Sequence, residues 1–123
     1  MKTNGLQTMS VPELVARFAA LAIAEYQAEL QNDIAKENRL IKQGWAVADE
    51  LKSRPGDQRS ALVRLYEHPN VQVRLNAARL TLAVAPKAAR ETVQAIADSR
   101  EYPQAGDAGM CLWALDQGIS KPT

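Results

Sequence analysis

The segment from His68 to Leu80 constrains the fold of this 123-residue chain more than any other part of it. It opens with His68-Pro69-Asn70, in which the proline favours a turn and the asparagine is a preferred helix N-cap. Apolar residues then recur at helical spacing, and they are Val73, Ala77, Leu80 and Val84. The segment therefore predicts a turn followed by an amphipathic helix over residues 70–84.

Composition extends this prediction to the whole chain. Hydrophobic residues make up 46% of the sequence and charged residues 24%, which is typical of a globular domain. Aromatic residues are only 5%, while alanine and leucine are abundant, which favours helices over a β-sandwich. A chain of this length buries a core of its own. We expect an all-α fold of about six helices, with no strand.

Capping residues set the expected helix boundaries. Ser10-Val11-Pro12-Glu13 is a capping box that predicts a helix over residues 11–30. A second helix is expected to run to residue 52 and a third to follow the N-cap Asp57. Beyond the helix at 70–84, Pro86 opens a fifth, and Asp107 is expected to cap a sixth that stops at Gly118.

The expected domain organisation follows from these helices. Residues 1–9 are expected to be a flexible N-terminal tail, residues 10–118 a single helical domain, and residues 119–123 a C-terminal tail. Because the connections are short, consecutive helices are expected to be antiparallel neighbours. The third and fourth helices would then form one pair and the fifth and sixth another, with the first two as an N-terminal cap.

The second helix carries two apolar stripes and one residue that fits neither. Ile34, Ile41, Trp45 and Ala48 share one stripe, and Leu40, Val47 and Leu51 make a neighbouring one. Asn38 lies within the first stripe, beside Arg39. If Asn38 is buried it must find hydrogen-bond partners, and free backbone groups at the turn of residues 68–70 would provide them. We favour this structural interpretation over a ligand site.

The chain resembles a small bacterial family of uncharacterised domains with an armadillo/HEAT-repeat-like fold. The resemblance is carried by Lys36-Glu37-Asn38-Arg39, His68-Pro69-Asn70 with Val73-Arg74, the stretch from Pro103 to Met110, and Leu115-Asp116. It implies a short right-handed α-solenoid of helix pairs that binds other proteins, and some similar small proteins act as immunity partners of toxins. Leu80-Thr81-Leu82 departs from the usual repeat pattern, which weakens the case for a regular array.

No residue pattern points to catalysis or to a bound metal. His68 is the only histidine and Cys111 the only cysteine, so they cannot fill a tetrahedral metal site. His68 is expected to face solvent or to cap a turn, and Cys111, on the apolar side of the last helix, to be an unreactive buried thiol. We therefore expect a non-enzymatic protein with no cofactor. With no disulfide, signal peptide or apolar run long enough to cross a membrane, it is expected to be cytoplasmic.

Charge is unevenly distributed along the chain, although the total is +1. Residues 52–90 hold eight basic and two acidic residues, whereas residues 1–51 and 91–123 are acidic overall. One interpretation is structural, with Arg74 bridging to an acid of the adjacent repeat. Another is a basic surface, from Arg64, Arg79 and Arg90, for an acidic protein. A third is self-association, with the acidic ends of one molecule meeting the basic middle of another, as in a homodimer.

The predicted function is that of a protein–protein interaction module with an unknown partner, regulatory or of the immunity type. The contact surface is predicted to comprise Leu75, Asn76, Arg79, Trp113 and Asp116, with Gln72 also facing outward. Trp113 is expected either in a dimer contact or as a lid over the last core layer. Nucleic-acid binding through the basic middle is the main alternative, although the low net charge disfavours it. A DNA glycosylase-type hydrolase, which needs a carboxylate and an aromatic in one pocket, ranks below it.

Overall fold

The protein is described by a computed structural model that covers residues 5–123, and within this range it is helical, with no strand. The elements are the 3-10 helices η1 (Leu6–Thr8) and η2 (Gln58–Glu67) and the α-helices α1 (Val11–Leu30), α2 (Ile34–Ser53), α3 (Val71–Arg79), α4 (Pro86–Asp98) and α5 (Gln104–Asp116). The chain divides into two compact units, Met1–Ala61 and Leu62–Thr123. The all-α prediction is confirmed for the described residues.

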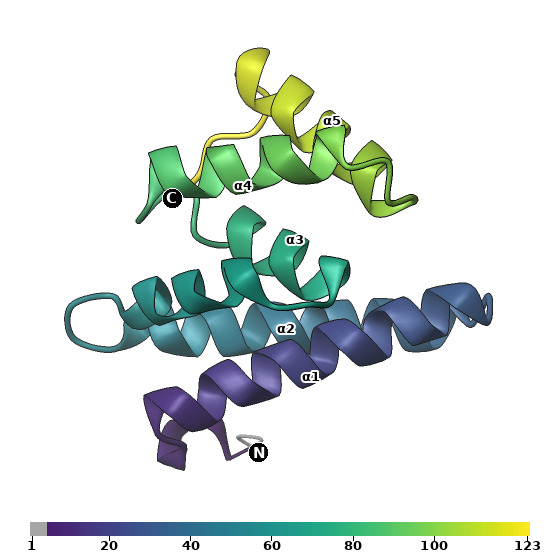
Figure 1. The fold of residues 1–123 in the computed structure, drawn as a ribbon. Helices are drawn as coiled ribbons and strands as arrows, with labels where there is room; N and C mark the ends of the chain where they lie inside the picture. Colours follow the sequence, from purple (N-terminus) through teal and green to yellow (C-terminus); the bar gives the residue numbers. More distant parts are fainter. Residues whose placement is uncertain (1–4) are drawn as a thin grey trace. The chain divides into compact units, whose positions relative to one another are not determined.

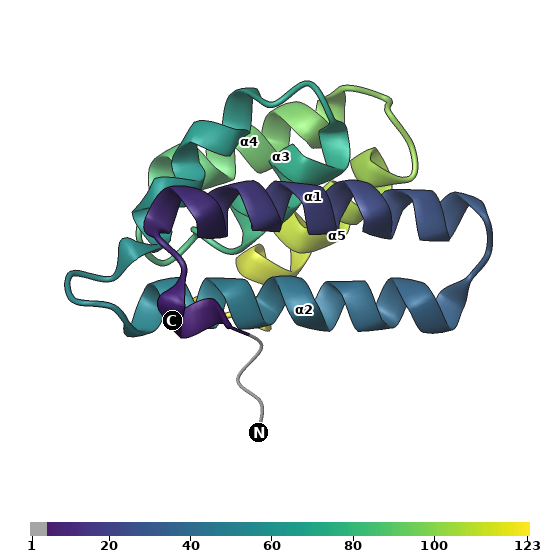
Figure 2. The same ribbon diagram turned by 90° about the horizontal axis from the view of Figure 1, so that it is seen from below.

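The first unit is built on an antiparallel pair, α1 and α2, which lie side by side in both views (Figures 1 and 2). The predicted capping box starts α1: the Glu13 amide donates to Ser10 Oγ at 3.2 Å, and the Ser10 amide donates to Glu13 Oε1 at 2.7 Å. These bonds satisfy two of the backbone N–H groups that every helix start leaves free. The hydrogen bond from the Ser10 backbone, and then the one from its side chain, lower the pKa of the Glu13 carboxyl.

The inward face of α2 takes residues from both predicted stripes and leaves others of the first stripe outside. Val47, Ala48 and Leu51 are buried, but Ile34 is 67% exposed and Trp45 is 54% exposed. Positions 45 and 47 point to nearly opposite sides of an α-helix, so the stripe that contains Val47 faces the interior and Trp45 faces solvent. The prediction that Asn38 is buried is also wrong, since it lies on the exposed side of α2.

The N-terminal segment has more structure than a flexible tail. The part of that prediction that concerns residues 1–4 lies outside the described residues. Leu6 begins η1 and is buried, and its carbonyl oxygen accepts a hydrogen bond from Arg54 Nη2 at 3.0 Å. The same guanidinium pairs with Glu50 at 3.0 Å. Arg54 therefore ties η1 to the C-terminal end of α2.

The third predicted helix is a 3-10 helix, η2, rather than an α-helix. Leu62 and Leu65, three residues apart, are both buried, which suits an element with three residues per turn. Asp57, the predicted cap, accepts a hydrogen bond from the Arg59 amide and pairs with the Arg59 guanidinium at 2.7 Å.

The helix predicted over residues 70–84 is shorter than expected. Asn70 caps α3 as predicted, because its Oδ1 accepts from the amides of Gln72 and Val73 at 2.9 and 3.2 Å. The helix ends at Arg79, and turns follow. Buried Thr81 donates its hydroxyl to the Ala77 carbonyl oxygen, a bond that competes with continued helix. Leu80-Thr81-Leu82 therefore departs from the repeat pattern in structure as well as in sequence.

The core of the second unit joins its three α-helices, since α4 packs on α5 and α3 packs on both. The buried cluster consists of Val71, Leu75 and Ala78 from α3, Val93 and Ile96 from α4, and Ala108 and Leu112 from α5. Pro86 opens α4 as predicted, and Gly118 follows α5 in the left-handed region with φ +73°. Asp107 is not the N-cap: α5 begins at Gln104, which places Asp107 within its first turn.

Candidate interaction surface

One side of α5 is exposed and largely uncharged. Met110 is 64% exposed and Trp113 is 52% exposed, and their spacing puts them on the same face as Gly106. The Tyr102 ring, also exposed, lies 4.0 Å from the position that a Cβ on Gly106 would occupy, so Tyr102 extends this face at its N-terminal end. We call Tyr102, Gly106, Met110 and Trp113 the α5 strip.

Acidic residues border the α5 strip. On a helical wheel Asp107 and Asp116 fall on opposite edges of the strip. Asp116 Oδ1 forms an ion pair with Nη2 of Arg90 in α4, at a distance of 2.6 Å. Both side chains are about half exposed. No hydrogen bond or ion pair engages the Asp107 side chain within residues 5–123. The charged side chains of α5 itself are these two carboxylates, of which Asp116 is paired with Arg90.

Two of the five predicted contact residues, Trp113 and Asp116, lie on this side of α5. A third, Leu75, is buried. Leu75 has no exposed area and lies in the core cluster with Val93 and Leu112. The prediction that it faces outward is wrong. The helical repeat alone does not say which side of α3 is covered, and α4 and α5 cover the side that carries Leu75.

Asn76 and Arg79, the other predicted contact residues, belong to a hydrogen-bonded network. Gln104 Nε2 donates to Gln72 Oε1 at 3.0 Å, and Gln72 Nε2 donates to Asn76 Oδ1 at 2.8 Å. Arg79 Nη2 donates to the same Asn76 oxygen at 3.1 Å. Gln72 and Gln104 are buried, so the prediction that Gln72 faces outward is also wrong. Sequence reasoning missed Gln104, which no local signal marked as buried.

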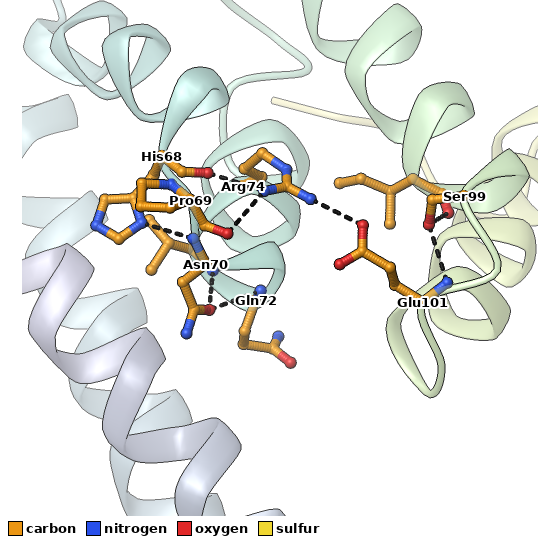
Figure 3. Close-up of polar contacts among 9 residues, drawn as sticks. His68, Pro69, Asn70, Gln72, Arg74, Ser99 and Glu101 are labelled. Carbon is orange, nitrogen blue, oxygen red and sulfur yellow. Dashed lines mark hydrogen bonds and ion pairs between the residues drawn. The ribbon is translucent and has the colours of Figure 1, made fainter.

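His68 and Cys111 both have structural surroundings. His68 Nδ1 accepts a hydrogen bond from the Asn70 amide at 3.0 Å, which confirms a turn-capping role (Figure 3). Cys111 is partly buried against the core cluster, and this burial raises the pKa of its thiol, although Arg79 and Arg90 act in the opposite direction. A thiol with a raised pKa is mostly protonated at neutral pH and is a poor nucleophile.

The basic middle of the chain is partly neutralised by ion pairs. Four of its eight basic residues pair with carboxylates, and these pairs are Arg54–Glu50, Arg59–Asp57, Arg74–Glu101 and Arg90–Asp116. Three of the four acids come from outside residues 52–90. The predicted bridge from Arg74 is among these pairs, at 3.2 Å. The uneven charge of the sequence is therefore less uneven on the folded surface.

The second unit also contains an open groove that combines an aromatic ring with carboxylates. Its lining includes Tyr66, Glu67, Arg74 and Glu91 together with apolar residues such as Ala88 and Ile96, and its volume is about 420 Å³. The Tyr66 hydroxyl is hydrogen-bonded to Thr81, and burial raises its pKa. This groove contains the residue types that the hydrolase alternative requires.

Residues 5–123 include no group of three or more His, Cys, Asp or Glu side chains suited to hold a metal ion. Within the same range, no helix is both long and apolar enough to cross a membrane.

Comparison with known proteins gives a family and a close structural relative. A family model described as a domain of unknown function (DUF2019) matches residues 12–116. The chain is 54% identical to the protein RPA1889 from Rhodopseudomonas palustris CGA009, and the crystal structure of that protein matches with a TM-score of 0.93. The match covers 96% of this chain and 98% of that one. No curated protein matches.

Proposed function

We propose that this chain, which belongs to the DUF2019 family, acts by binding a protein partner and catalyses no reaction. The observation that carries the proposal is the α5 strip. Two aromatic rings and a methionine are exposed on it, near Gly106, which has no side chain of its own. Contiguous exposed apolar residues of this kind mark protein-interaction sites, and aromatic residues and methionine are enriched in them.

The proposed architecture is a short right-handed stack of HEAT/armadillo-type helix pairs in the cytoplasm. The ion pair from Arg74 of α3 to Glu101, which precedes α5, supports this, because it links one predicted helix pair to the next. In such stacks the second helices of the pairs form the binding face, and α5 has that position in the last pair. A regulatory role and an immunity role both fit a binding module of this kind.

Two alternatives have weaker support. Nucleic-acid binding would need a concentrated basic surface, whereas half of the basic residues of the middle segment are paired with acids. Hydrolysis would use the groove with Tyr66, Glu67 and Glu91, but the tyrosine hydroxyl is already engaged by Thr81. If Glu67→Gln and Glu91→Gln variants abolish an activity of the purified protein on DNA, the non-enzymatic proposal is wrong.

The test is affinity capture from the native host with the wild-type chain and a Met110→Ala, Trp113→Ala double variant. Leu30→Ala is the matched control, because it removes another exposed apolar side chain, at the end of α1. We expect a protein that is captured by the wild type and by the control and is lost with the double variant. Capture that is identical for all three chains, with all three folded by circular dichroism, would refute a role for the α5 strip.

A further inference from the structure

We propose that the α5 strip of one molecule binds the exposed side of α2 in a second copy of the same chain. The inference rests on the proposed function and names one partner for that surface. It depends on a complementarity in apolar character and charge between two surfaces that are each described within their own unit.

The exposed side of α2 carries apolar and basic residues, with one exposed acid, Asp49, a turn after Trp45. Ile34 and Trp45 are exposed at eleven residues' separation, which is three turns of an α-helix, so they lie on the same side. Beside them a shallow groove is lined by Ala35, Asn38, Arg39, Lys42, Gln43 and Ala46. Arg39 and Lys42 take part in none of the ion pairs within residues 5–123. We call Ile34, Arg39, Lys42 and Trp45 the α2 strip.

The α5 strip has the matching properties. Its aromatic rings and methionine offer apolar contact to Ile34 and Trp45, and Asp107 at its edge offers an unpaired carboxylate to Arg39 or Lys42.

Pairing two different surfaces has a geometric consequence. A contact between α2 of one copy and α5 of the next leaves a free α5 strip on the first and a free α2 strip on the second. Such a heterologous contact adds copies head to tail, in contrast to a two-fold dimer in which one surface meets itself. Because exposed charges contribute, association is expected to weaken as salt concentration rises.

The experiment is sedimentation velocity on the purified full chain over a wide range of concentration. Trp113→Lys blocks the α5 strip by placing a positive charge opposite the basic α2 strip, and Trp45→Glu blocks the α2 strip in the same way. Both positions are exposed, so both variants are expected to fold, and circular dichroism and thermal unfolding verify this. We expect wild-type chains to associate and each variant alone to lose association.

Mixing the two variants gives the decisive result. The Trp45→Glu chain retains an intact α5 strip and the Trp113→Lys chain an intact α2 strip, so association is expected to return in the mixture. A mixture that stays monomeric overturns the inference, as does persistent self-association of the Trp45→Glu chain, which would mean that α5 pairs with itself. If the wild type is monomeric throughout but capture still depends on the α5 strip, the inference fails and the proposed function stands with another partner.

Discussion

Arg74 and Glu101 join the turn before α3 to the loop before α5. Arg74 Nη2 lies 3.2 Å from Glu101 Oε2, while Nη1 donates to the carbonyl oxygens of His68 and Pro69 at 2.9 and 3.1 Å (Figure 3). One guanidinium therefore binds two carbonyl oxygens on one side and a carboxylate on the other. These contacts come from segments 27 residues apart in the chain.

Replacing Arg74 should destabilise the fold more than replacing Glu101. Glu101 is half exposed, so Glu101→Gln is expected to cost about 1 kcal/mol or less. Arg74→Ala also leaves the His68 and Pro69 carbonyls without a donor, and it is expected to cost about 1–3 kcal/mol. Urea unfolding of the two variants measures both values. Equal losses would show that the ion pair, and not the carbonyl contacts, is the main contribution of Arg74.

The capping box should make stability depend on pH. Hydrogen bonds hold the pKa of Glu13 below its ordinary value of 4.5, so its contribution is present above that value and is lost as pH falls through the folded-state pKa. The stability difference between the wild type and Glu13→Ala should therefore shrink in acid. A difference that stays constant as the pH falls would contradict this account.

The other half of the capping box gives a prediction at neutral pH. Ser10→Ala removes the acceptor of the Glu13 amide and is expected to cost about 1 kcal/mol. Thermal or urea unfolding of the wild type and the variant measures this loss of stability. No loss of stability would mean that water replaces the serine hydroxyl at this helix start without cost.

Leu75 and Trp113 should respond to alanine substitution in opposite ways. Leu75→Ala opens a cavity in the core cluster and is expected to cost about 2–5 kcal/mol. Trp113→Ala acts on an exposed side chain, so its effect on unfolding is expected to stay within about 0.5 kcal/mol, while binding is lost. If Trp113→Ala destabilises the fold as strongly as Leu75→Ala, the tryptophan is part of the core and not of a docking surface.

Cys111 should react slowly with alkylating reagents. Burial raises the pKa of its thiol, so at neutral pH the folded protein should react with iodoacetamide more slowly than the urea-unfolded chain, and its rate should climb at higher pH. Arg79→Gln removes one of the two charges that favour the thiolate and should slow the reaction further. Faster reaction in the folded state would indicate an activated thiol.

Features that depend on neighbouring residues were predictable from the sequence. The capping box at Ser10 and Glu13, the Asn70 cap and the Pro86 start are all confirmed. In each case the donor and acceptor, or the restricted backbone, lie within three residues. The same locality explains why the bounds of α1 were predicted correctly. The start of α5 was predicted wrongly, because the helix begins at Gln104 and not after Asp107, the residue that resembled its cap.

Features that depend on distant residues were not predictable. Trp45 and Val47 belong to the two predicted apolar stripes of α2, and only the position of the packing helix decides which of the two residues is covered. The partner of Arg90 is Asp116, 26 residues away, and the buried amide of Gln72 finds Gln104 at a separation of 32. For the candidate surface, the sequence indicated Trp113 and Asp116 but missed Met110 and Tyr102, because nothing local distinguishes an exposed apolar residue from a core one.

Photo-crosslinking from the α5 strip tests the central claim most directly. Trp113 is replaced by the photoreactive p-benzoylphenylalanine, the chain is expressed in its native host, and the cells are irradiated. The same replacement at Leu30, which is also exposed, is the control. We predict an adduct with a defined protein from position 113 and not from position 30, and an adduct between two copies would also support the head-to-tail contact. Equal adducts from both positions, or none from either, would contradict the claim that the α5 strip is a docking surface.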